Sequence, residues 1–270
     1  MAEKGLDYNE YVEIADGTYW DGFFDEMAGL HCNPYLILDE DEDVLIDSGS
    51  RNDFSTVMLK IMRTGTDPRN IKRLIYQHYD PDLCGNIPHM EALIGNKDLK
   101  ILSHSENNIF INYYSSKAAK ENIDDTDYKY VFKSGRTLRF IRIPYSHSPG
   151  SFVTYDEKTK VLFSSDLFGS YDTDWSLYSS ICEKCAECTP ENICPETKKS
   201  CQLIGIWDFH RRTMTSTKAL KFALKQVEEL DIAMIAPQHG SIFSTPESCK
   251  VVIDRLKSFA RVGIDDFLEE

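Results

Sequence analysis

The first half of the chain alternates short apolar runs with polar turns. The runs at residues 11–20, 34–41, 43–49, 71–78 and 100–104 have the length and composition of β-strands. Residues 53–63 instead place Phe54, Val57, Ile61 and Met62 at helical spacing, with Asn52 or Asp53 as a candidate cap. A second helix is expected to start near Pro88. This half is therefore expected to be a sheet with helices.

The second half repeats the scheme. Strands are predicted at residues 136–144, 151–156, 161–166 and 232–240, and amphipathic helices at 216–230 and 246–262. Only residues 170–205 lack a clear periodicity, and no linker or shift in composition divides the chain. We expect a single α/β domain over residues 1–270, in which two packed sheets carry helices on their outer faces.

The composition of the chain restricts the kinds of partner and the cellular location that can be expected. The chain has 270 residues, 41% of them hydrophobic, and a formal net charge of −14. Such acidity argues against nucleic acids and anionic membrane surfaces, which attract basic footprints. No apolar run approaches the roughly 18 residues of a transmembrane helix. The acidic N-terminal stretch lacks the apolar core of a signal peptide. These features predict a cytoplasmic protein, with the run "DEDED" at 39–43 as a solvated turn.

The stretch "YQHYDPDLCGNIP" at residues 76–88 places His78, Asp80 and Asp82 at two-residue spacing. Three further donor side chains follow apolar runs: His147, Asp166 and His239. Strand ends are where a rigid scaffold brings side chains together, so these six residues form a candidate metal constellation. Three other histidines, His89, His104 and His210, are interpreted as ordinary surface or core residues.

The blocks "HYDPDLCGN", "PYSHSPGSFVTYDEKTKVLFSSDLFG" and "IAPQHGSIF" resemble the metal-binding segments of the metallo-β-lactamase superfamily. More narrowly, they resemble the diiron domain of flavodiiron proteins, over nearly the whole chain except residues 170–205. The resemblance implies an αββα sandwich that holds two metals. It assigns His78, Asp80 and His147 to the first metal, Asp82 and His239 to the second, and Asp166 to a bridge between them.

Two positions depart from the family pattern. Asp80 stands where flavodiiron proteins have glutamate and the wider superfamily has histidine, and carboxylate–histidine sets favour iron over zinc. Leu83 stands where the family has a histidine ligand of the second metal. Its apolar side chain leaves an open coordination position, as a ligand-binding metal needs. Alternatively the second site is poorly occupied, or another side chain replaces the ligand.

Flavodiiron enzymes continue into a flavodoxin domain, and no Gly/Ser/Thr-rich phosphate loop for flavin follows a strand here. The chain resembles the branch called oxygen-binding diiron proteins. That resemblance implies a diiron protein that binds dioxygen as a diferric–peroxo type adduct, and that senses oxygen in the signalling or chemotaxis of an anaerobe. A signalling protein would then be its partner. His31, Tyr79 and Tyr145 are candidates for an oxygen pocket beside Leu83.

Two other functions stay open from the sequence. One is an oxygen or nitric-oxide reductase supplied by an external electron donor. The other is a zinc hydrolase of thioesters or lactams. A homodimer is also left open, although the flavin-to-iron pairing that favours dimers in flavodiiron proteins needs the flavin domain.

A cysteine-rich insert lies at about residues 180–202. It contains Cys182, Cys185, Cys188, Cys194 and Cys201 in the order CxxCxxC, then Cys-Pro, then a last cysteine. Thiolates so closely spaced can bind zinc or an iron–sulfur cluster, although the last gap is two residues too long for a ferredoxin-type motif. A thiol redox pair or a plain loop are the alternatives. If the insert holds an iron–sulfur cluster, it could pass electrons to the diiron site.

Overall fold

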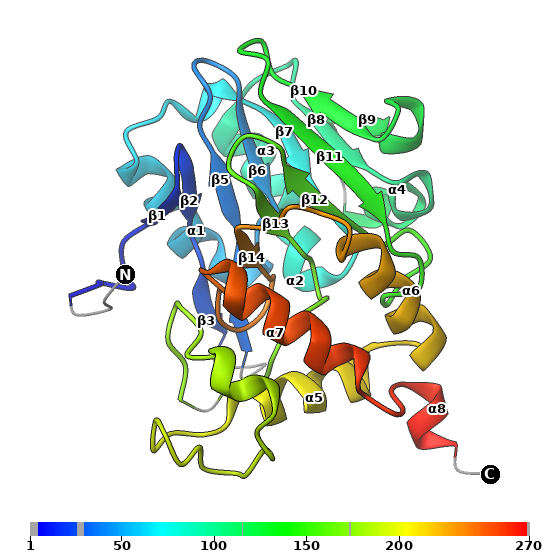
Figure 1. The fold of residues 1–270 in the computed structure, drawn as a ribbon. Coiled ribbons are helices and arrows are strands. Elements are labelled where there is room, and N and C mark those ends of the chain that lie inside the picture. The colour runs from blue at the N-terminus through cyan, green and yellow to red at the C-terminus, as the bar shows by residue number, and fades with distance from the viewer. Residues whose placement is uncertain (1–4, 26–29, 115, 173, 269–270) are drawn as a thin grey trace. The chain divides into compact units, whose positions relative to one another are not determined.

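The computed structural model describes residues 5–25, 30–114, 116–172 and 174–268. Figure 1 shows the chain as a ribbon. It divides into two compact units, one formed by residues 1–140 and 157–159 and the other by residues 141–156 and 160–270. In the described residues, no helix is both long enough and apolar enough to span a membrane.

The first unit is built on a seven-stranded sheet with the order β1-β2-β5-β6-β7-β8-β9. The pairs β1-β2, β2-β5 and β5-β6 are antiparallel. The pairs β6-β7, β7-β8 and β8-β9 are parallel. Their bounds are β1 Val12–Ala15, β2 Thr18–Trp20, β5 Tyr35–Ile37, β6 Asp43–Ile46, β7 Ile71–Ile75, β8 Lys100–Ser103 and β9 Ala119–Asn122. Two antiparallel hairpins complete the strands: β3 Phe23–Asp25 with β4 Leu30–Cys32, and β10 Lys129–Val131 with β11 Thr137–Arg142.

Four α-helices belong to the first unit: α1 Phe54–Arg63, α2 Pro81–Cys84, α3 Ile87–Ile94 and α4 Ser105–Ile111. Short 3-10 helices lie at Arg51–Asp53, Pro68–Asn70, Asn112–Tyr114 and Ile123–Asp125. Val57 and Ile61 of α1 pack with Leu45 of β6 and Leu74 of β7 in one apolar core. The helix predicted at residues 53–63 is thus confirmed, and Val57 and Ile61 of its predicted face are buried, whereas Met62 is 47% exposed.

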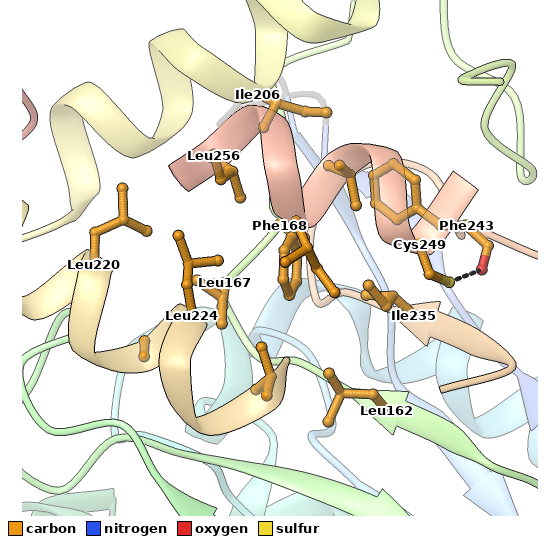
Figure 2. Packing of buried hydrophobic residues seen from close by; sticks show 14 of the residues in the cluster. Leu162, Leu167, Phe168, Ile206, Leu220, Leu224, Ile235, Phe243, Cys249 and Leu256 are labelled. Carbon is orange, nitrogen blue, oxygen red and sulfur yellow. Dashed lines mark hydrogen bonds between the residues drawn. The ribbon is translucent and has the colours of Figure 1, made fainter. Parts of the chain in front are cut away.

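In the second unit, β12 Phe152–Asp156 pairs antiparallel with β13 Val161–Phe163, and β13 pairs parallel with β14 Met234–Ala236. Its helices are a 3-10 turn at Glu183–Ala186, then α5 Gln202–Thr213, α6 Thr217–Val227, α7 Pro246–Lys257 and α8 Ile264–Phe267. Figure 2 shows Leu220 and Leu224 of α6 and Leu256 of α7 directed at one apolar core, with Leu162 of β13 and Ile235 of β14.

Most of the expected elements are confirmed, with shifted ends. The helix predicted at 246–262 ends at Lys257, and its start is fixed by a reciprocal pair of hydrogen bonds between Thr245 and Ser248. Helix α5 was not predicted: its first turn lies in the stretch 170–205 that lacked periodicity, and no helix was expected at residues 206–213 either. The acidic run at 39–43 is only partly solvated: Asp43 is 1% exposed and accepts a hydrogen bond from Thr66. Asp39 is also buried, at 8% exposed, so the interpretation as a solvated turn is wrong at both ends of the run.

Candidate metal centre

The six predicted donor residues divide equally between the units, and three of them follow the same local rule. Strand β7 ends at Ile75, β13 at Phe163 and β14 at Ala236. His78, Asp166 and His239 each come three residues after those strand ends. The sequence placed them inside the strands or at the strand ends. They lie instead on loops that a buried strand holds at one end, where the backbone is free to direct a donor atom.

Asp166 in the second unit faces two histidines through different oxygens. The Oδ2 atom of Asp166 lies 2.9 Å from Nε2 of His147, and Oδ1 lies 3.7 Å from Nε2 of His239. The side chains of Asp166 and His239 are each 5% exposed, and that of His147 is 22% exposed. The structure thus brings these three predicted residues together, with the carboxylate between two imidazoles.

Backbone hydrogen bonds hold the loops that carry Asp166 and His239 side by side. The Ser164 amide donates to the Ala236 carbonyl (3.1 Å), and the Gln238 amide donates to the Ser165 carbonyl (2.9 Å). These bonds continue the parallel pairing of β13 and β14 beyond the strands. Leu167 and Phe168, which follow Asp166, point into the apolar core (Figure 2). Packing on one side and hydrogen bonds on the other fix the carboxylate.

His210 supports this loop from α5, a role that the sequence did not reveal. Its Nε2 accepts the Phe168 amide proton (3.1 Å), so the proton of the neutral ring is on Nδ1, which lies 2.7 Å from the Ile206 carbonyl. Burial lowers the pKa of His210 to about 4. The expectation of an ordinary structural histidine is confirmed, and its partner lies two residues from Asp166.

Gly240 directly follows His239 and is required there for steric reasons. Its φ is +85°, and a Cβ atom at this position would lie 2.1 Å from the Ser170 Oγ. Any other residue would therefore be strained in its backbone and would also displace Ser170. The close approach keeps the His239 loop against the loop that follows Asp166.

The first unit contributes His78, Asp80 and Asp82. The His78 side chain is 1% exposed, and its Nε2 lies 4.0 Å from Oδ2 of Asp80, too far for a hydrogen bond. The backbone is extended at Asp80 and turns into α2 at Pro81, so Asp82 stands in the first helical turn. The three donors are therefore presented by an extended residue that bends into a helix.

Leu83 is fully buried in the apolar core of the first unit. Its carbonyl accepts hydrogen bonds from the amide (3.1 Å) and the hydroxyl (2.9 Å) of Ser48, which anchor α2 to the loop after β6. The neighbouring Cys84 thiol lies 3.7 Å from the His78 carbonyl and donates to it. Leu83 thus has a packing role, and its relation to an open coordination position stays a prediction.

The other candidates for an oxygen pocket have ordinary local contacts. The His31 ring on β4 lies 4.8 Å from that of Phe24. The Tyr79 ring stacks on Phe110 at 4.5 Å, and burial, together with Asp80, raises the Tyr79 pKa. Tyr145 is 56% exposed. Their proposed contact with oxygen stays a prediction.

Of the two other histidines set aside as structural, His104 caps α4 by accepting the Glu106 amide proton (3.2 Å). The His89 ring lies 5.1 Å from that of Phe54. The five cysteines of the insert lie in the second unit, in the segment between Ile181 and α5.

Comparisons with known proteins bear on the whole arrangement. A structure described as the peroxy diiron species of the chemotaxis sensor ODP superposes with a TM-score of 0.73 and 26% identity, over 95% of this chain and 97% of that one. The protein MJ0732 of Methanocaldococcus jannaschii is 29% identical over 92% of this chain and 60% of its own length. The coenzyme F420H(2) oxidase of Methanothermobacter thermautotrophicus is 25% identical over 87% of this chain and 58% of its own.

The chain thus spans about 60% of the length of the first of these curated relatives and 58% of the second. The metallo-β-lactamase fold expected from the sequence is confirmed by these matches. A single family model, described as ODP family beta lactamase, matches residues 30–240 and so runs through both units. The chain belongs to the ODP family of β-lactamase-like proteins.

Proposed function

We propose that this protein binds dioxygen at a pair of iron ions and acts as a cytoplasmic oxygen sensor in the signalling or chemotaxis of an anaerobe. The observation that carries the proposal is the nearly full-length match to the chemotaxis sensor ODP, which was observed as a peroxy diiron species. Membership of the ODP family supports it independently. A signalling protein is then the expected partner.

The six donor residues are proposed to hold the irons as the family resemblance implies. His78, Asp80 and His147 would hold one iron, and Asp82 and His239 the other, with Asp166 shared. The donor set fits iron, because three imidazoles and three carboxylates match the nitrogen and oxygen ligands of non-haem iron that reacts with dioxygen. The orientation of Asp166, with one oxygen toward each histidine, suits a bridging carboxylate.

When bound, two ferrous ions supply the electrons that the capture of dioxygen requires. The protein holds the donor side chains in position and surrounds them with an environment of low dielectric constant. His78, Asp166 and His239 are nearly fully buried, so water has little access to their donor atoms. Neutral His210 holds the Phe168 amide, which keeps the loop after Asp166 in place without adding a charge there. Leu83 places hydrocarbon, and no donor, at the family's histidine position.

A second candidate function is supported by the similarity to coenzyme F420H(2) oxidase. In that case the same residues would serve an oxygen or nitric-oxide reductase, and an external electron donor would be needed. The zinc hydrolase has weaker support, because Asp80 replaces the imidazole that hydrolases use at this position of the superfamily motif.

Metal analysis of the protein purified without oxygen tests the iron assignment. We expect about two irons per chain beyond any iron that accompanies acid-labile sulfide. Stoichiometric zinc in their place would contradict the proposal and favour the hydrolase.

A further inference from the structure

Five cysteines in the second unit line one cavity of about 200 Å³. They are Cys182, Cys185, Cys188, Cys194 and Cys201, and all five thiols are free. The cavity lies within residues 180–203, apart from the His147, Asp166 and His239 donors of the same unit. None of the five takes part in the proposed oxygen chemistry, so this segment needs its own explanation.

Burial in this segment is partial and falls mainly on its cysteines. Between residues 182 and 201, the only side chains that are not exposed are those of Ser200, Cys185, Cys188, Cys194 and Cys201. Regular structure is limited to the 3-10 turn Glu183–Ala186 and a small hairpin in which Ile193 pairs with Ser200. Apolar burial therefore does little to offset the conformational entropy that ordering these residues costs. Bonds from thiolates to a metal would offset it.

The cysteines are also attached to the body of the unit. Cys185, Cys188 and Cys201 pack against the apolar core that contains Leu203 and Ile206. Arg255 of α7 donates to the carbonyls of Ala186 and Cys188, both at 3.2 Å. Cys201 is the N-cap residue of α5, where the helix dipole favours a negative group. These contacts attach the segment around Cys185, Cys188 and Cys201 to the apolar core, to α7 and to α5.

The thiols differ in how readily they ionise. Burial raises the pKa of Cys185 to about 11, and the neighbouring Cys182 and Cys188 add to the shift. Backbone and side-chain hydrogen bonds from Thr197, with a further backbone bond from Glu196, lower the pKa of Cys194. Amide and hydroxyl donors thus surround Cys194, while Cys182 and Cys188 lie close to Cys185.

The distances between the sulfur atoms distinguish a site for a single zinc ion from a site for a four-iron cluster. Around a single zinc ion with Zn–S bonds near 2.3 Å, all sulfurs lie about 3.8 Å apart. In the described residues, no three of these five sulfurs lie within 4.8 Å of one another. In a four-iron cluster each thiolate binds a different iron, which spaces the sulfurs at about 6 Å. The five sulfurs, all in the described part of the chain, line one cavity and no three of them gather at the spacing of a single zinc site, which favours the larger group.

We propose that the insert binds a [4Fe–4S] cluster through Cys185, Cys188, Cys194 and Cys201. These four cysteines are partly buried, whereas Cys182 is exposed. The iron–sulfur cluster would fill the cavity and join the insert to α5 and α7. Arg255 and the N-terminus of α5 would offset part of its negative charge.

Acid-labile sulfide in the full chain, purified without oxygen, tests this directly, because the diiron centre contains none. We expect about four sulfides per chain and a broad visible absorption that dithionite bleaches. Cys188→Ser should reduce the sulfide to background and leave the two other irons in place. Cys249→Ser, which removes a buried thiol outside the insert, and Cys182→Ser should both keep the sulfide.

Three results would overturn the proposal. One is a single zinc ion per chain without sulfide, which indicates a zinc site. The second is an insert without metal in which all five thiols react with a thiol reagent in the folded protein. The third is loss of sulfide in Cys182→Ser, which would reject the ligand assignment. Asp166→Ala should keep the sulfide, so failure of the diiron proposal and failure of this one give different results.

Discussion

Asp166 and Leu83 are the two residues on which the account of the diiron site depends most. Asp166 directs its two oxygens at different histidines and is held by the core and by backbone hydrogen bonds. Leu83 fills apolar space at the position where the family motif has a histidine. The first residue is proposed to be shared by both irons, and the second to withhold a ligand from one of them.

Replacing the shared carboxylate should affect both irons together. Asp166→Ala is expected to lower the affinity for each iron by at least about 10-fold, because a bridging ligand serves both ions. Asp172→Asn is the matched control, since Asp172 is a half-buried carboxyl in the same unit that accepts hydrogen bonds from Ser170 and Ser241. Iron content measured on both variants checks this, and full iron content in Asp166→Ala would reject the bridge.

Leu83→His tests whether this position faces the metal. A buried imidazole without a partner should lower the stability of the metal-free protein by about 2–4 kcal/mol. Iron should restore part of this loss if the new imidazole reaches it. Ile87→His, in the same core, should be destabilised equally with and without iron. Denaturant unfolding with and without iron gives the comparison, and equal losses for both variants would show that Leu83 faces only the core.

At the scale of elements, the strands could be located from the sequence more reliably than the ends that matter for the site. Apolar runs identified β7, β13 and β14, yet each strand ends three residues before its donor. Strand ends depend on which backbone groups find partners, such as the bond from the Gln238 amide to the Ser165 carbonyl. Those partners come from distant segments, and a local pattern contains no information about them.

Helix α5 shows the same limit for a helix. It follows the cysteine-rich insert, and its apolar residues Leu203, Ile206 and Phe209 are interrupted by Gly205 and by polar positions. The supporting role of His210 was equally invisible, because it depends on the Phe168 amide 42 residues away in the sequence. The donor residues themselves could be proposed early, because motif spacing is local.

The His210 contact predicts a pH dependence of stability. Its folded-state pKa of about 4 lies below the ordinary 6.5, so the unfolded chain binds more protons between these values. Stability should therefore fall as the pH drops from 6.5 to 4, by about 3 kcal/mol from this residue. In His210→Gln the glutamine keeps a donor and an acceptor and does not titrate. The unfolding free energy of this variant should therefore fall less between pH 6.5 and pH 4 than that of the unsubstituted protein. Parallel profiles for the two proteins would contradict this assignment.

At the scale of the whole molecule, one family model runs through two compact units, each of which carries half of the proposed ligands. The metallo-β-lactamase fold was predicted correctly from three short motif blocks, which lie in both halves of the chain and whose resemblance extends over nearly all of it. The cysteine-rich insert is the part that the resemblance did not cover. Its interpretation depends on the cavity and the placement of the sulfurs, which only the structure provides.

The most direct test of the central claim is oxygen titration of the fully reduced, iron-loaded protein in the absence of other reductants. We expect uptake of about one dioxygen per iron pair and a visible absorption band that persists. This band should be absent from Asp166→Ala, which separates it from any absorption of the insert. Immediate decay to the spectrum of oxidised iron, followed by continued oxygen consumption when a reductant is added, would contradict a binding protein and indicate a reductase.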